Sequence, residues 1–132
     1  MTDYEIRFFG FHHDTSAEDT NRLMRQFYGI KGEVFRDIGT REIRSALEQG
    51  SAVMIPVNAQ YLGIYGQKAP PRHMIIVKGY TDSGFIINDP LIKNGANRVI
   101  VDEDLQRSLR DFPSGIYREV KEQKTAMIVI KR

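Results

Sequence analysis

The sequence predicts an α+β fold in which helices pack against an antiparallel β-sheet. In the first third of the chain, apolar residues recur at helical spacing, whereas the later runs are short and strand-like. Two apolar runs are separated only by the turn sequence Thr81–Gly84, so they should pair as an antiparallel hairpin. Both runs are apolar nearly throughout, and we therefore expect a sheet that is covered on both faces.

The first predicted element is a helix over residues 16–28. Thr15 and Glu18 fit a capping box before it, and Gly29 provides a stop. The apolar stripe of this helix consists of Leu23, Met24, Phe27 and Tyr28, with Thr20 one turn earlier.

Three further elements follow before the middle of the chain. Residues 33–38 alternate in polarity and predict a short strand. A second helix is predicted over 41–49, with Thr40 as its cap and Gly50 at its end. Residues 51–57 are mostly apolar and predict a buried strand.

The second half of the chain consists mainly of strands. The predicted segments are a long loop over 58–72, the hairpin over 73–88, a second loop over 89–97, a strand over 98–101, a helix over 103–111 capped by Asp102, and a closing strand over 125–130. Loops as long as the first of these are often functional.

Length and composition restrict the classes of function. The 132 residues suggest one domain, and 41% apolar with 27% charged residues is ordinary for a globular protein. The 19 basic and 17 acidic residues are scattered, which argues against a nucleic acid or an anionic membrane as partner. The apolar stretches are too short for a membrane span, and the N-terminus has no signal-peptide pattern, so the compartment is undetermined.

The chain contains no cysteine. This excludes disulfides, thiolate metal sites and a cysteine nucleophile within these residues. No cofactor or metal site is predicted.

His73 and Asp89 form the predicted site. A hairpin turning at Thr81–Gly84 lays residues whose numbers add up to about 162 or 163 opposite one another, which brings Asp89 beside His73. A carboxylate beside a histidine fixes the tautomer of the imidazole for acid–base catalysis. Taken singly, His73 would be read as a structural histidine and Asp89, before Pro90, as a turn residue. Asn88 should face away from His73, because neighbouring strand residues alternate.

Several motifs around this pair occur in the order and spacing of a known family. They are Ala46–Val57, the loop Ala69–Met74, Lys78–Tyr80, Gly84–Pro90, Lys93–Gly95 and the helix over 103–111. With them the chain resembles the papain-like cysteine peptidases of the bacteriocin-leader (double-glycine) type, family thirty-nine, and in particular their stand-alone bacterial branch.

The resemblance implies a papain-like domain in which His73 is the general base and acid and Asp89 orients it. It also implies a cysteine at the start of a helix, with an oxyanion-hole glutamine before it, and neither can be placed here. The helix with the nucleophile therefore lies before Met1 or has been lost. Two functions follow: a thiol peptidase whose cysteine comes from elsewhere, or a catalytically inactive module that binds peptides.

The implied partners are a peptide or protein substrate and a second polypeptide that packs on the face near His73. We expect either an exposed apolar patch there, or a partner on it, which would be an N-terminal fragment or a second copy of the chain. Alternatively, the helix over 16–28 replaces the missing one and brings Ser16 close to His73.

Other candidate residues have simpler explanations. Ser16 is expected to cap a helix rather than act as a nucleophile, and no G-x-S-x-G elbow is present. His12-His13-Asp14 is expected to be a solvated loop, since adjacent histidines on a strand face opposite ways. In the long loop, Gln60, Tyr61, Tyr65 and Gln67 either line a cleft or pack on the sheet.

Overall fold

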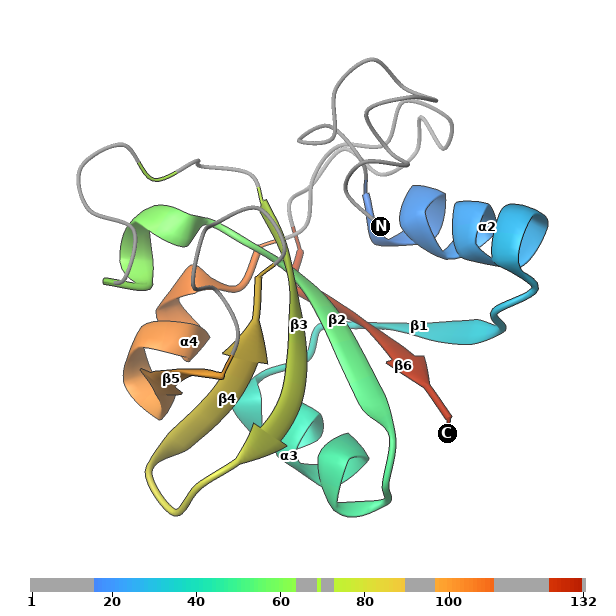
Figure 1. The fold of residues 1–132 in the computed structure, drawn as a ribbon. Helices are drawn as coiled ribbons and strands as arrows, with labels where there is room; N and C mark the ends of the chain where they lie inside the picture. The colour runs from blue at the N-terminus through green and yellow to red at the C-terminus, as the bar shows by residue number, and fades with distance from the viewer. Residues whose placement is uncertain (1–15, 64–68, 70–72, 90–96, 111–123, 132) are drawn as a thin grey trace.

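The computed structural model describes residues 16–63, 69, 73–89, 97–110 and 124–131, and the predicted α+β fold is confirmed (Figure 1). Six strands form one antiparallel sheet in the order β1-β6-β2-β3-β4-β5. The elements are α2 (Ala17–Tyr28), β1 (Gly32–Arg36), α3 (Thr40–Glu48), β2 (Ala52–Val57), the 3-10 turn η1 (Ala59–Tyr61), β3 (His73–Tyr80), β4 (Gly84–Asn88), β5 (Arg98–Val101), α4 (Asp102–Ser108) and β6 (Ala126–Ile130).

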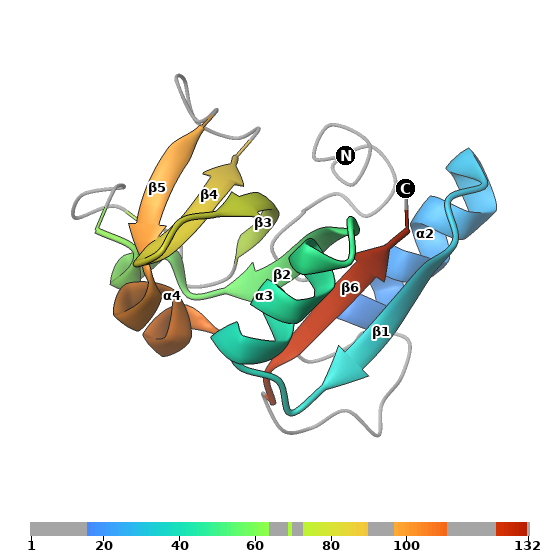
Figure 2. The same ribbon diagram turned by 90° about the horizontal axis from the view of Figure 1, so that it is seen from below.

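Helices lie on both faces of the sheet, but among the described residues α2 packs mainly on β1 and β6, so the prediction that the central hairpin is covered on both faces is confirmed for one face only. Figures 1 and 2 show α3 and α4 on one face and α2 on the other. The larger core lies on the first face, where Phe85, Ile55 and Ile75 are fully buried together with apolar residues of α3 and α4. On the second face, Ala17 and Met24 of α2 contact residues of β2 and β6. No helix among the described residues is long and apolar enough to cross a membrane.

The first helix begins and ends by local chemistry. The Ser16 hydroxyl accepts a hydrogen bond from the backbone N–H of Asp19 at 3.2 Å, which confirms its predicted capping role. At the other end Gly29 has φ 68°, a left-handed conformation that glycine adopts without a steric penalty. The predicted capping box of Thr15 and Glu18 is wrong, because Ser16 occupies the N-cap position and caps Asp19. Thr15 itself lies outside the described residues.

The predicted cap of α3 is wrong by one residue. Thr40 is already helical, and Gly39 occupies the N-cap position. The Glu42 carboxylate accepts a hydrogen bond from the Gly39 N–H at 2.9 Å, so the acidic half of a capping box is made without a hydroxyl.

The last helix is shorter than predicted. Asp102 is its first helical residue, rather than its cap, and α4 ends at Ser108 instead of near residue 111. Beyond it the chain joins the end of β2: the Asn58 N–H donates to the Ser108 carbonyl at 2.7 Å, and the Arg110 N–H donates to the Pro56 carbonyl at 3.2 Å. Pairing with a distant strand thus ends a helix that local propensity would extend.

Arg44 connects α3, the central hairpin and α4. Its guanidinium donates to the Thr81 carbonyl at 2.7 Å and pairs with the Asp102 carboxylate at 3.1 Å. It also lies 5.1 Å from the ring centre of Tyr80 and 4.9 Å from that of Phe85. The closed end of the hairpin is therefore fixed against both helices.

Gly84 tolerates no side chain, and this leads to a test of the β4–β5 contact. A Cβ atom at Gly84 would lie 2.3 Å from the carbonyl oxygen of Ile100, a backbone atom that cannot rotate away. We expect Gly84→Ala to lower the free energy of unfolding by about 1–3 kcal/mol, measured by urea denaturation. In Gly79→Ala, the matched control, the new Cβ meets only the Ile86 side chain, at 3.5 Å. Equal losses in both variants would contradict this explanation.

Candidate functional site

His73 and Asp89 come from the ends of adjacent strands. His73 is the first residue of β3 and pairs with Val57 at the end of β2, while Asp89 directly follows the last residue of β4. The His73 Nε2 and Asp89 Oδ2 atoms are 2.5 Å apart, and the side chains are 1% and 0% exposed. The predicted contact between these two side chains is confirmed.

The predicted register of the hairpin is wrong by one to three residues, because the numbers of paired residues add up to 164 or 165 rather than 162 or 163. Tyr80 lies opposite Phe85 because the Thr81 N–H donates to the Gly84 carbonyl at 2.8 Å and sets the turn. The register shifts between Val77 and Gly79, an irregularity that sequence patterns do not reveal.

The contact between His73 and Asp89 is therefore diagonal. Ile76 pairs with Asn88, so continuation by one residue places Asp89 opposite Ile75. His73 lies two residues farther along β3 on the same face of the strand. An aromatic ring such as the imidazole reaches across such a diagonal, which is why the contact is made despite the error in register.

Asn88 has a different partner from its neighbour. Its side-chain oxygen accepts a hydrogen bond from the Asn97 N–H at 3.0 Å, and Asn97 has φ 59°. This bond connects the residue before Asp89 to Asn97 and so restricts the backbone next to Asp89. It also agrees with the expectation that Asn88 does not face His73.

Asp89 contacts the Nε2 atom of the imidazole. A carboxylate in this position holds the ring in one orientation and stabilises the imidazolium form. The contact is strong because both groups are removed from water. Among the described residues, no three His, Cys, Asp or Glu side chains cluster in a way that could hold a metal ion.

The segment after β2 lies beside the same end of the sheet. The Gln60 side chain donates to the Ala69 carbonyl at 3.4 Å, and the Arg107 guanidinium lies 5.4 Å from the ring centre of Tyr61. Tyr61 remains 45% exposed. Tyr65 and Gln67, together with His12-His13-Asp14, lie outside the described residues.

Ser16 is held in a capping role on the other face of the sheet. Its hydroxyl accepts from Asp19, and α2 packs mainly on β1 and β6. Alternation along β3 places His73 with Ile75 and Val77, on the face of α3 and α4. This arrangement favours the cap over the serine nucleophile.

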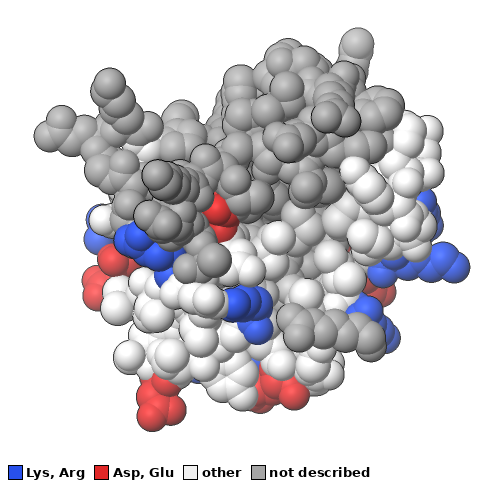
Figure 3. Space-filling model, viewed as in Figure 1, with Lys and Arg blue, Asp and Glu red and all other residues white. Residues whose placement is uncertain are grey.

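The face that α2 covers only in part carries exposed apolar residues. Val99 and Val101 of β5 are 58% and 49% exposed, and Ile86 beside them is half-buried. Figure 3 shows a largely uncharged surface over β2, β3 and β4. These residues lie on the opposite face of the sheet from the His73 side chain, so they are not the apolar patch that was predicted beside His73.

The fold is that of a C39-like peptidase. A crystal structure described as a C39-like peptidase from Bacillus anthracis matches with a TM-score of 0.59 and 15% sequence identity, over 89% of this chain and 60% of that one. The chain belongs to the Peptidase_C39 like family, whose sequence model matches residues 4–125. It thus spans 60% of the length of its structural neighbour. A search of curated proteins gave no match.

Proposed function

We propose that this chain supplies the histidine–aspartate half of a thiol peptidase site, with His73 as general base and acid and Asp89 as its orienting carboxylate. The contact of 2.5 Å between their buried side chains carries the proposal. The family is that of C39-like peptidases, which supports a peptide or protein substrate.

The reaction is acyl transfer to a thiol that these 132 residues do not contain. His73 takes the thiol proton through Nδ1, and the thiolate attacks the scissile carbonyl carbon. The imidazolium then returns the proton to the leaving amine as the C–N bond breaks. Water, deprotonated by His73, releases the acyl group and restores the thiol.

A second function is favoured by the absence of cysteine. A domain that keeps the fold but has no nucleophile of its own would bind peptides without cleaving them. The two functions predict different behaviour of the chain when the coding sequence upstream of Met1 is added.

The test begins with that upstream sequence. If it encodes a glutamine and then a cysteine that opens a helix, we expect the extended protein to cleave peptides with a double-glycine motif, as measured by mass spectrometry. His73→Ala should reduce cleavage by at least about 10³-fold, as loss of a catalytic base does. Glu48→Gln, at an exposed carboxylate of α3, should leave the rate unchanged.

Cleavage that persists in His73→Ala would contradict the assignment of the base. If no such cysteine is encoded, the same peptides should bind to the 132-residue chain and remain intact. Absence of binding in a calorimetric titration would then contradict the second function.

A further inference from the structure

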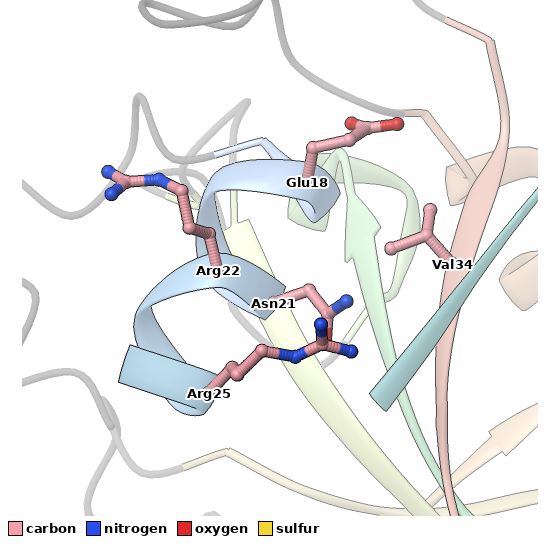
Figure 4. Close-up of a pocket in the computed structure, with 5 residues that line it drawn as sticks. All are labelled: Glu18, Asn21, Arg22, Arg25 and Val34. Carbon is pink, nitrogen blue, oxygen red and sulfur yellow. The ribbon is translucent and has the colours of Figure 1, made fainter. Parts of the chain in front are cut away.

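The edge strand β1 is flanked by a hollow on each of its two faces. On the side of α2, a hollow of about 220 Å³ is lined by Val34 and by Glu18, Asn21, Arg22 and Arg25 of the helix (Figure 4). On the side of α3, a hollow of about 380 Å³ has Phe35, Met127 and Val129 among its lining residues. Neither hollow includes His73 or Asp89.

In β1, the backbone N–H and carbonyl groups of every second residue point toward the open edge of the sheet. The Asp37 N–H donates to the Thr125 carbonyl at 2.9 Å, and this pair continues the register between β1 and β6. Bonded pairs alternate along an antiparallel ladder, so Glu33 and Phe35 bond to β6 while Val34 directs its N–H and carbonyl outward. In the sheet formed by the described strands, β1 has a neighbour on one side only.

The two hollows differ in charge. Glu18 is paired with Arg36, which leaves Arg22 and Arg25 as the excess charge among the residues that line this hollow. The Arg22 side chain extends away from Val34 (Figure 4). In Figure 4, Val34 points toward α2, and the Arg25 side chain extends toward Asn21. The other hollow is lined by apolar residues that include Phe35, itself 40% exposed, and by the charged residues Glu33, Glu42 and Lys131.

We propose that β1 is a docking edge for an extended peptide segment in which acidic and apolar residues alternate. Val34 would exchange backbone hydrogen bonds with the segment. Side chains along an added strand point alternately to the two faces of the sheet, so acidic residues approach Arg25 on the face of α2 while apolar residues reach Phe35 on the other face. Arg22 adds positive charge to the same helix. This surface is separate from the His73 site and does not depend on the proposed function.

A second copy of the chain fits this edge less well. If two β1 strands paired about a two-fold axis at Val34, both α2 helices would lie on the same face. Arg22 and Arg25 of each copy would then approach their counterparts, and like charges across an interface are unfavourable. An acidic peptide supplies the opposite charge.

The probe is a fluorescein-labelled peptide of seven residues in which valine and glutamate alternate, with a second peptide carrying lysine in place of glutamate. We expect a rise in anisotropy with the first peptide and at least about tenfold weaker binding of the second, because the lysines approach Arg25. Hydrogen exchange at the Val34 amide should slow when the first peptide binds.

Two variants test the surface itself. Val34→Pro removes the outward N–H without removing a bond to β6, as proline at a sheet edge allows, and should abolish binding. Arg25→Glu should weaken binding about tenfold, whereas Arg41→Glu, the same change of charge on the exposed start of α3, should have no effect. If Val34→Pro fails to fold, the proposal is tested by the peptide affinity of Arg25→Glu and by the hydrogen-exchange rate of the Val34 amide.

Four results would overturn the proposal. The first three are no binding at millimolar peptide, equal affinity for both peptides, and binding that Arg25→Glu leaves unchanged. Protection of the Val34 amide that depends on protein concentration, without peptide, would identify a second copy as the occupant and would equally refute the peptide.

Discussion

Asp89→Ala is expected to lower the free energy of unfolding by about 3–5 kcal/mol, because it leaves the imidazole of His73 buried without its carboxylate. The side chains are 1% and 0% exposed, so water cannot replace the lost partner in the folded state. Urea denaturation followed by circular dichroism at neutral pH measures the loss.

Two further variants give this result its meaning. Asp89→Asn keeps an oxygen that can accept from Nε2–H and fills the same volume, so it should cost less than half as much as the alanine variant. Asp82→Ala removes an exposed carboxylate from the hairpin turn and should change stability by no more than about 0.5 kcal/mol. Losses of similar size in Asp89→Ala and Asp82→Ala would show that the buried contact contributes little.

Phe85→Ala is also expected to lower the free energy of unfolding by about 3–5 kcal/mol. The mechanism is different, because this substitution opens a cavity in the core. Phe85 lies in β4, has no exposed surface and contacts the main apolar cluster of the protein. Its ring also lies 4.9 Å from the Arg44 guanidinium, and this contact disappears with it.

The matched control for Phe85 is an exposed residue on the neighbouring strand. Val99 is 58% exposed, so Val99→Ala removes little buried surface and should cost less than about 0.5 kcal/mol. If the two variants lose equal stability in the same denaturation experiment, the packing of β4 against α3 and α4 is not as described.

Most elements of the fold could be predicted because their signals are local. The turn at Thr81–Gly84 and the apolar runs beside it predict the hairpin without knowledge of the other strands. Gly29 ends its helix through its own backbone conformation, at φ 68°. Such signals lie within a few residues of the element that they specify.

The errors occur where distant segments compete with local preference. Arg110 is drawn from the predicted helix into a bond with Pro56. The turn sets a register that would place Asp89 opposite Ile76, and the shift beside Lys78 moves it opposite Ile75, on the face of His73. Neither effect has a local sequence pattern, because each depends on the segment that lies alongside.

The sequence by itself determined the α+β class, the family and the pairing of the strand ends that carry His73 and Asp89, because hydrophobic periodicity and turn chemistry are local signals. The register that puts both side chains on one face of the sheet was decided only by the tertiary structure, since a slip of one residue would turn Asp89 away. Only the tertiary structure decided which imidazole nitrogen contacts the carboxylate, which strand forms the edge of the sheet, and which charges flank it. These features depend on the order of strands in space and on side-chain burial. Both arise from contacts between residues far apart in the chain, which a local pattern does not specify.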